Sequence, residues 1–520
     1  MEHTPKPVLQ TPVQPIWLKA AAWFMVCCAG LNHFAYVTAD PDLWGHIRFG
    51  DDTWRHGFLE SADPYAYTTA HTTWINHEWL SELILFGLYK IGGDASLLAF
   101  KLLIGIALLI IIMQICRVRP YHPIILAVIA LPAVISIAPG FMLRPQLASY
   151  LLFGGYVFVF HLYFHSGKNR LWLLPLLMVC WVNLHGGFLM GIALLGWVIG
   201  WQSLAVLLRI ESGPPLKPLW VTGIAVGLAS CINPYGYKLH LFLYYSLKTE
   251  RAISEWEPVT ILDNSFLTFK LLAALFLLAA VLGREKRLHW EIAGLVLLLY
   301  AAIRHQRHIP FYAIMVVPYL VYQGSRLATV IRTVNPRFVL SRGSQVILAV
   351  AFGLIGIHQA AAGIGKNIQT GWRIVVNPDA YPVAAVSFMR QNNFQGNLQL
   401  PFEWGEYAIW HLYPNCRVSI DGRFRTTYPE TVIQDHFQAR ANPGLTLTLA
   451  EKYAADIILT KQKAAMQAVI NRYDSDWLYV YSDPVAIIFL RNNHRNAKLL
   501  AAFKNKEWRY PQKAPSAFFP

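Results

Sequence analysis

Charged side chains are scarce in this chain. Asp, Glu, Lys and Arg make up 14% of its 520 residues, whereas a soluble globular protein averages about 25%. Hydrophobic residues account for 55%, and apolar runs close to the ~20 residues that cross a bilayer recur along the first two-thirds of the chain. These proportions argue against a water-soluble globular protein, and we expect a polytopic membrane protein.

Cysteine is scarce too. Five of the six cysteines lie in or beside apolar runs and Cys416 stands alone beyond them, so their spacing implies no disulfide framework. The first apolar run is not followed by an Ala-x-Ala-like cleavage site and leads directly into Asp40. We therefore expect a retained membrane span there, and no cleaved signal peptide.

Eleven apolar segments have the length and composition of membrane spans. They lie near residues 16–38, 95–116, 124–140, 146–164, 171–184, 188–208, 218–232, 266–283, 289–303, 310–323 and 344–362. The segment 78–91 is short, begins with charged residues and ends in Gly92-Gly93, so we expect it to lie in the outer interface without spanning. The sequence thus predicts a transmembrane helical domain over 1–362, with interfacial helices in a first outer loop at 39–94.

Basic residues are concentrated in every second connection between the predicted spans, and this pattern predicts the orientation of the protein in the membrane. By the positive-inside rule the basic connections are cytoplasmic, and Lys6 places the N-terminus with them. They contain Arg117 and Arg119; Lys168 and Arg170; Arg209 and Lys217; Arg284, Lys286 and Arg287; Arg326, Arg332, Arg337 and Arg342. The positive-inside pattern therefore accounts for much of the net charge of +15, so this charge does not require a nucleic-acid partner. We expect a multi-pass protein of the cell (inner) membrane.

The opposite, outer connections collect acids, imidazoles and guanidiniums. A charged group at bilayer depth costs about 2.5–3.5 kcal/mol, so such groups are read first as functional. The candidate catalytic residues are Asp40, Asp42, His46 and Glu78. The candidate phosphate-binding residues are Arg144, His185, Arg304, His305, Arg307 and His308. We expect them to converge on one site at the membrane–water boundary.

Structural explanations compete at several of these positions. Arg144 could be a lone snorkelling arginine. The glycines after His185 suffice to explain a tight helix–helix turn, and Asn233-Pro is a common helix stop. Two acids at 40 and 42 exceed what capping one helix requires. Two arginines and two histidines within 304–308 run against the charge bias of an outer connection, so a functional interpretation is favoured there.

This residue set suits one kind of chemistry. A carboxylate can accept a proton from an attacking hydroxyl, and an Asp-x-Asp pair can hold a divalent cation. Arginine and histidine can bind a phosphate and stabilise the charge of a departing phosphate oxygen. A phosphate held at a membrane surface suggests a lipid carrier. We therefore expect group transfer from a polyprenyl phosphate to a hydroxyl, with membrane lipids as surroundings.

Two other functions stay open. A transporter or lipid-linked glycan flippase would be expected to carry ionisable groups near the midplane and broken helices in matching halves, and no internal repeat is visible here. A glycan polymerase or ligase with another fold would share the outer-face arginines. Such an enzyme needs no acidic pair after the first span.

The sequence resembles the GT-C superfamily of glycosyltransferases along nearly its whole length. The matching stretches are 40–50 (Asp-Pro-Asp-Leu-Trp-Gly-His-Ile-Arg-Phe-Gly), 63–68, 74–80, 404–407 and 420–423, which are similar to a bacterial and archaeal branch of that superfamily. The resemblance implies inverting transfer of a hexose or pentose from a polyprenyl-phosphate sugar, on the outer face, to a lipid, glycan or protein acceptor of the cell envelope. It also implies a base or metal ligand at Asp40 or Asp42. Catalysis without a cofactor and catalysis with Mg²⁺ or Mn²⁺ both stay open.

The tail beyond residue 362 is expected to be a periplasmic domain over 363–520. Predicted strands at 397–400, 417–420, 456–460, 477–481 and 485–490 alternate with predicted helices near 382–391, 449–454 and 462–472. This alternation favours a small α/β domain. Candidate acceptor-binding or domain-interface residues are Asn233, Tyr235, Glu403, Glu406, Asp421 and Arg423. Helix-start and turn chemistry would also account for the four in the tail.

Overall fold

The computed structural model describes residues 14–69, 72–209, 213–248, 254–260, 262–282, 290–335, 337, 339–462, 476–510 and 517–520. The predicted helix at 462–472, apart from its first residue, lies outside this range, as do Lys6, Arg284, Lys286 and Arg287. The chain forms two compact units, and each is assembled from separate segments. Unit 1 comprises residues 1–36, 98–240 and 249–371, and unit 2 comprises 37–97, 241–248 and 372–520.

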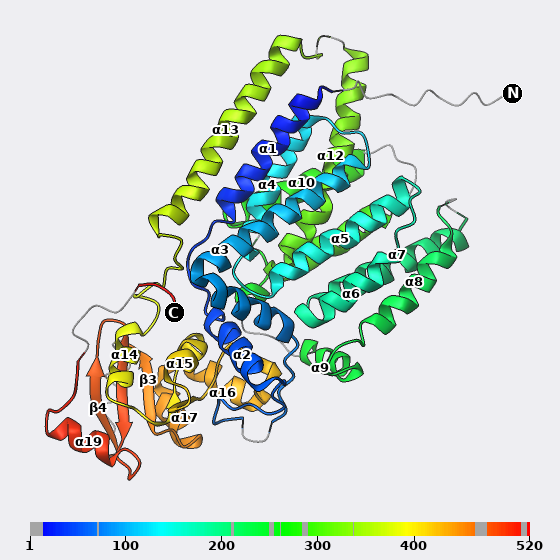
Figure 1. The fold of residues 1–520 in the computed structure, drawn as a ribbon. Helices are drawn as coiled ribbons and strands as arrows, with labels where there is room; N and C mark the ends of the chain where they lie inside the picture. The colour runs from blue at the N-terminus through cyan, green and yellow to red at the C-terminus, as the bar shows by residue number, and fades with distance from the viewer. Residues whose placement is uncertain are drawn as a thin grey trace. The chain divides into compact units, whose positions relative to one another are not determined.

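Unit 1 is a bundle of helices (Figure 1). Its helices are α1 (Ile16–His33), the C-terminal part of α3 (Trp79–Arg117), α4 (Pro123–Ile137), α5 (Gln146–His165), α6 (Leu173–Leu184), α7 (Phe188–Leu207), α8 (Leu216–Ala229), α10 (Leu267–Leu282), α11 (Trp290–Arg304), α12 (Ile309–Val334) and α13 (Arg342–Gln369). A further helix, α9 (Tyr237–Leu247), follows α8. Each of the eleven predicted segments coincides with one of the bundle helices.

Six helices among the described residues are long and apolar enough to cross a membrane. They are Trp79–Arg117, Pro123–Gly140, Gln146–His165, Phe188–Leu207, Gln306–Val334 and Arg342–Gln369. The remaining apolar helices are shorter, for example the 12 residues of α6. A multi-pass helical architecture is therefore confirmed, and the number of eleven spans stays a prediction.

Helix α3 is broken where the sequence predicts a boundary. Gly92 and Gly93 leave the helical conformation, and Gly93 takes φ 57° and ψ −143°, a region that side chains with a Cβ rarely enter. The Ser96 hydroxyl donates to the carbonyl oxygens of Leu88 at 2.5 Å and Gly93 at 2.8 Å. The part of α3 before the break belongs to unit 2. Segment 78–91 and the predicted span at 95–116 are thus two helical pieces.

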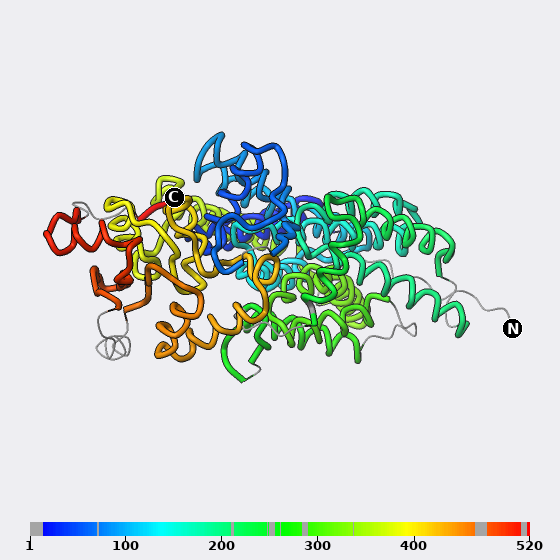
Figure 2. Tube along the Cα trace, turned by 90° about the horizontal axis from the view of Figure 1, so that it is seen from below, coloured from blue at the N-terminus to red at the C-terminus, as the bar shows by residue number. Residues whose placement is uncertain are grey.

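Unit 2 contains a five-stranded sheet in the order β2-β1-β3-β5-β4. Its strands are β1 (Gly396–Gln399), β2 (Cys416–Val418), β3 (Ile457–Lys461), β4 (Trp477–Ser482) and β5 (Ala486–Arg491). Strand β1 pairs in parallel with β2 and β3, whereas β5 pairs antiparallel with β3 and β4. The last strands and the helix that follows them, orange to red, lie together in both views (Figure 1, Figure 2). All five predicted strands are confirmed.

Helices cover this sheet, as an α/β domain requires. They are α14 (Val383–Gln391), α15 (Gly405–Leu412), α16 (Glu430–Ala441), α17 (Thr446–Lys452) and α19 (Ala497–Lys504). The sequence predicts α14 and, with shifted bounds, α17. Buried Ile458, Phe489 and Leu447 belong to one hydrophobic cluster, which places the core between β3, β5 and α17.

The segment after α1 is an integral part of unit 2. It contains α2 (Leu43–His56) and an extended stretch that adds to the edge strand β2. The Val418 amide donates to the Tyr65 carbonyl at 3.0 Å, and the Tyr67 amide donates to the Val418 carbonyl at 3.1 Å. Two further main-chain bonds join Val37 and Ala39 to Val375. The segment after α1 and the tail therefore share one hydrogen-bonded framework.

Candidate functional site

The Asp-Pro-Asp motif forms the turn that starts α2. The Asp40 carboxylate accepts a hydrogen bond from the Asp42 amide at 3.0 Å, and the Asp40 carbonyl accepts one from the Leu43 amide at 3.1 Å. This is an Asx-type turn, in which the aspartate stabilises the chain reversal. Asp40 is 2% exposed, whereas Asp42, the N-cap residue, is partly exposed. The two carboxylates therefore have different local environments.

Glu406 of α15 reaches the first turn of α2. Its Oε2 atom accepts a hydrogen bond from the Gly45 amide at 3.1 Å, at a helix N-terminus, where the macrodipole favours negative charge. A Cβ on Gly45 would lie 2.1 Å from Glu406 Oε2. A Cβ on Gly422 would lie 2.4 Å from Asp42 Oδ1 and 2.6 Å from Glu406 Oε1. The space at both glycines therefore lets the carboxylates of Asp42 and Glu406 approach the start of α2 and Gly422 in these positions.

The Glu406 carboxyl is almost fully buried, with 3% exposure. Burial, and then the charges of Asp42 and Asp421, raise the pKa of Glu406 well above its ordinary range. The physical cause is that a second negative charge in a buried place close to Asp42 is unfavourable. Glu406 consequently favours its protonated form, in which the carboxyl is a hydrogen-bond donor.

His46 lies four residues after Asp42 on α2 and is also buried. Its Nδ1 atom is 3.6 Å from Glu82 Oε1, and Glu82 also accepts a hydrogen bond from the Asn76 side-chain amide at 2.5 Å. Burial lowers the pKa of His46, but the carboxylates of Glu82, Glu78 and Asp42 outweigh it and raise that pKa overall. We call Asp42, His46, Glu78, Glu82 and Glu406 the acidic cluster. Three of these five are sequence-predicted catalytic residues.

Asp421 and Arg423 lie together inside unit 2. The Arg423 guanidinium donates to Asp421 through two nitrogens, at 2.9 Å and 2.6 Å, and to Asp63 Oδ1 at 2.6 Å. The Tyr428 hydroxyl donates to Asp421 Oδ2 at 2.5 Å. The rings around the guanidinium, between 4.9 Å and 6.0 Å from its central carbon, are those of Phe49, Tyr65, Trp74 and Tyr428. Arg423 thus links the segment after α1 to the turn after β2.

Burial disfavours charge on Arg423, but Asp421 and Asp63 outweigh burial and raise the pKa of Arg423 well above its usual value. The guanidinium therefore stays charged within its ring of aromatic side chains. Glu403, also predicted in the tail, has a different environment: it pairs with Arg440 at 2.9 Å and with Lys461 at 3.7 Å.

In unit 1, the described segment 254–260 packs along the 303–308 connection. The Val259 amide donates to the Ile303 carbonyl at 2.8 Å, and the Gln306 amide donates to the Glu257 carbonyl at 3.2 Å. This pairing holds residues 305–308 next to Glu255 and Trp256. Segment 254–260 therefore contacts the predicted basic residues at 305–308 and fixes their backbone, and we refer to it as their support.

Four predicted phosphate-binding residues meet at this support. Arg144 donates to Glu255 Oε1 at 2.8 Å, the Arg307 guanidinium lies 4.5 Å from the Trp256 ring centre, and His305 Nδ1 donates to the Trp256 carbonyl at 2.7 Å. The His308 ring lies 6.0 Å from that of His305 and 6.3 Å from that of Trp256. We call Arg144, His305, Arg307 and His308 the basic cluster.

The other predicted residues of unit 1 lie elsewhere or serve local turns. Arg304 is the exposed last residue of α11. His185 Nδ1 accepts from the Gly187 amide at 3.0 Å and lies 2.7 Å from the Ser149 hydroxyl. The Asn233 side chain accepts from the Tyr235 amide at 2.9 Å, which is the turn chemistry of a helix stop.

Several residues that matter here had no sequence signal of their own. Glu82 and Glu255 stand in amphipathic segments where an acid is unremarkable, and only the fold brings them to His46 and Arg144. One set of metal-type ligands comes together among the described residues: His161, His165 and Glu291, with ligand atoms within 4.8 Å of one another. It lies in unit 1, so the alternative of Mg²⁺ or Mn²⁺ at Asp40 and Asp42 stays a prediction.

No protein-family model and no curated protein matches the chain. Its fold is similar to that of the archaeal oligosaccharyltransferase AglB from Archaeoglobus fulgidus in complex with an inhibitory peptide and a dolichol-phosphate, at 13% identity and a TM-score of 0.54, over 90% of this chain and 73% of that one. The Archaeoglobus fulgidus oligosaccharyltransferase tethered with an acceptor peptide is 12% identical, with a TM-score of 0.51. The match covers 92% of this chain and 74% of that one. ArnT from Cupriavidus metallidurans in the apo state is 13% identical, with a TM-score of 0.50. The match covers 91% of this chain and 97% of that one.

AglB and ArnT are GT-C superfamily glycosyltransferases. The resemblance predicted from the sequence is therefore confirmed at the level of the fold. This chain has a mostly helical, multi-pass fold with a C-terminal sheet, and that fold is similar to the folds of these enzymes.

Proposed function

We propose that the protein is a membrane glycosyltransferase that moves a hexosyl or pentosyl group from a polyprenyl-phosphate donor to a hydroxyl acceptor on the outer face of the membrane. The observation that carries the proposal is the acidic cluster at the start of α2, within a chain of GT-C-type fold. The acceptor belongs to the cell envelope and is a lipid, a glycan or a protein.

Asp42 is the proposed base. It is the more exposed member of the aspartate pair, and it lies close to a buried carboxyl, Glu406, whose pKa is raised. Asp40 is the positioning residue, because its carboxylate is bound to the Asp42 amide. The acidic neighbours of His46 raise its pKa, which favours a positive charge close to the base.

In the proposed reaction the acceptor oxygen attacks the anomeric carbon on the face opposite the phosphate. The hydroxyl proton passes to the Asp42 carboxylate, and the bond between the anomeric carbon and the phosphate oxygen breaks. The polyprenyl phosphate leaves with that electron pair. One displacement of this kind inverts the anomeric configuration.

The basic cluster is the proposed donor-phosphate site. Arg144 and Arg307 offer fixed forks of donors that suit a phosphate. Arg144 would exchange its partner Glu255 for the donor phosphate. AglB was solved with a dolichol-phosphate, a lipid phosphate of the class proposed here.

Asp42→Asn tests the base, with Asp40→Asn as its matched control. Asparagine at 40 keeps a side-chain oxygen for the Asp42 amide, so we expect most of the activity to remain. Asparagine at 42 cannot take the proton, so we expect a loss of about 100-fold or more. The assay supplies radiolabelled polyprenyl-phosphate hexoses and pentoses to membrane vesicles with the outer face exposed, and measures labelled product and free polyprenyl phosphate.

Two outcomes contradict the proposal. If both variants transfer as fast as the wild type, no aspartate of this motif is the base. If wild-type vesicles release polyprenyl phosphate from none of the donors, the protein is not this kind of transferase.

A further inference from the structure

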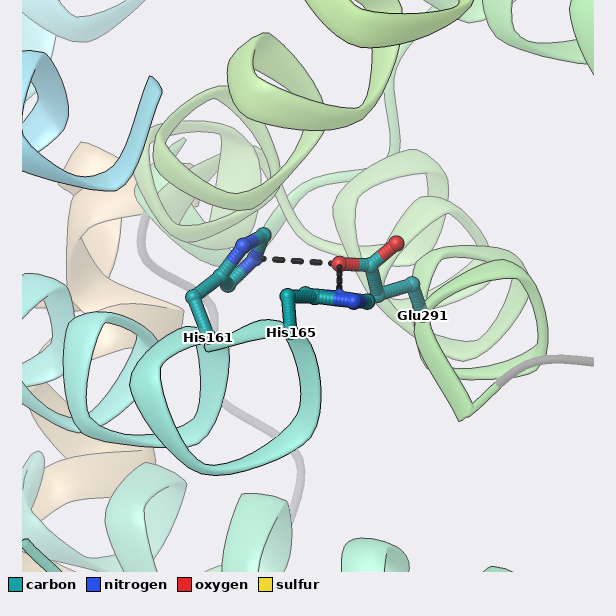
Figure 3. Close-up of side chains that lie close together, drawn as sticks. All are labelled: His161, His165 and Glu291. Atoms are coloured by element: carbon teal, nitrogen blue, oxygen red, sulfur yellow. Dashed lines mark hydrogen bonds and ion pairs between the residues drawn. The ribbon is translucent and has the colours of Figure 1, made fainter. Parts of the chain in front are cut away.

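Two histidines and a glutamate meet at the end of α5 that lies away from Arg144. His161 and His165 are four residues apart on α5, so they share one face of the helix. Both rings point to the carboxylate of Glu291 on α11 (Figure 3). His161 Nε2 lies 3.1 Å, and His165 Nε2 2.9 Å, from the same oxygen, Glu291 Oε1.

The surroundings of the three side chains are dry. Their exposed fractions are 2% for His161, 15% for His165 and 4% for Glu291, and the Trp290 ring lies 5.9 Å from the His161 ring. A carboxylate in such a place needs a partner of opposite charge. The cluster is therefore built to hold a cation.

Arg119 supplies the cation in this structure. Its Nη2 atom contacts both His165 Nε2 and Glu291 Oε1, and its guanidinium lies 4.5 Å from the Tyr322 ring centre. The Arg119 Nη2 atom therefore lies where one cation meets two of the three ligand atoms.

The ligand atoms of the three side chains converge on one point. His165 Nε2 and Glu291 Oε1 lie 2.9 Å apart. The guanidinium offers single protons along fixed directions. A metal ion would satisfy both atoms together with His161 Nε2, because all three ligand atoms lie within 4.8 Å of one another.

We propose that His161, His165 and Glu291 bind a divalent transition-metal ion of the Zn²⁺ type, and that the Arg119 guanidinium takes the place of the ion when it is absent. Two histidines and a glutamate are an established ligand set for zinc, with bonds of about 2.0–2.2 Å, and leave a fourth position for water. Arg119 keeps the Tyr322 ring as a partner once displaced.

The metal site is separate from the proposed transfer chemistry. Helix α5 has 20 residues and is therefore about 30 Å long, with Arg144 just before its start and the metal ligands in its last turns. An ion there would fasten α5 to α11. It would not touch a donor phosphate at the basic cluster, so the metal site and the glycosyltransferase proposal can fail independently.

The test titrates the purified full chain in detergent, after removal of metal with a chelator. Zn²⁺ alone is followed by calorimetry, and Co²⁺ is followed by its visible absorption, whose intensity reports four-coordinate geometry. We expect one equivalent to bind to the wild type. Arg119→Gln removes the competing charge and should bind at least about tenfold more tightly. His358→Gln, at an exposed position of α13, should match the wild type.

The single substitutions His161→Gln, His165→Gln and Glu291→Gln should each weaken binding by about 100-fold or more, beyond the 10–100-fold that outer-shell partners contribute. Two results overturn the proposal: no saturable one-equivalent binding in either the wild type or Arg119→Gln, or binding that survives in His161→Gln and Glu291→Gln. Because Arg119→Gln keeps every proposed ligand, it decides the question even where a ligand variant fails to fold.

Discussion

Replacing Arg423 with methionine should destabilise unit 2 strongly. The side chains of Asp63 and Asp421 are fully buried, and Arg423 is the guanidinium that pairs with both. Removing one partner of a buried ion pair costs about 3–5 kcal/mol, because it leaves an uncompensated charge in the interior. For a unit of roughly 200 residues, each kcal/mol lowers the melting temperature by about 2–4 °C. The expected fall is therefore about 6–20 °C.

The measurement is thermal unfolding of the full chain in detergent, followed by tryptophan fluorescence, with Arg440→Met as the control. Arg440 pairs with Glu403 at 2.9 Å but is 55% exposed, so its loss should cost at most about 1 kcal/mol. Adding Asp421→Asn to Arg423→Met should restore part of the stability, since it removes one of the stranded charges. Equal melting temperatures for the Arg423 and Arg440 variants would refute the reasoning.

Three further outcomes are expected. Gly45→Ala should destabilise by about 1–3 kcal/mol in chemical unfolding, because its Cβ would lie 2.1 Å from Glu406 Oε2; an unchanged midpoint would contradict the close contact. The folded-state pKa of Glu406 is raised, so its contribution to stability is present below its unfolded pKa and is lost as pH rises through the folded pKa. Glu406→Gln should therefore gain melting temperature relative to the wild type as pH rises from 5 to 9, and a pH-independent difference would contradict the shift. Arg307→Ala should weaken donor binding by roughly tenfold to hundredfold, measured with labelled polyprenyl phosphate, whereas Arg304→Ala, at the exposed end of α11, should weaken it less; equal affinities for wild type and Arg307→Ala would remove the basic cluster from the donor site.

Local patterns were enough to predict most of the secondary structure. Apolar runs of helical length became helices, and short β-branched and aromatic runs in the tail became strands, because each pattern is a property of neighbouring residues. The break at Gly92-Gly93 was predictable for the same reason: glycine allows backbone angles that other residues avoid. Helix α16, with little apolar periodicity, was not predicted.

Contacts between distant segments were not predictable from such patterns. Asp63 and Arg423 are separated by 360 positions in the chain, and nothing in either neighbourhood identifies the other. The pairing of Asp42 with Glu406 depends on Gly45 and Gly422, which in sequence look like ordinary turn or helix glycines. Candidate residues could be named from the sequence, but their partners could not, and the roles given to them stay predictions.

The joint construction of unit 2 has a consequence for how the protein is made. Residues 37–97 leave the ribosome early, but the sheet edge and the glutamate that complete them belong to residues 372–520. At about 5–20 residues per second, the roughly 275 intervening residues take about 15–60 seconds to synthesise. During that interval Asp63 lacks its partner Arg423 and Tyr65 lacks its partner Val418, so unit 2 can complete its fold only after the last third of the chain has been made.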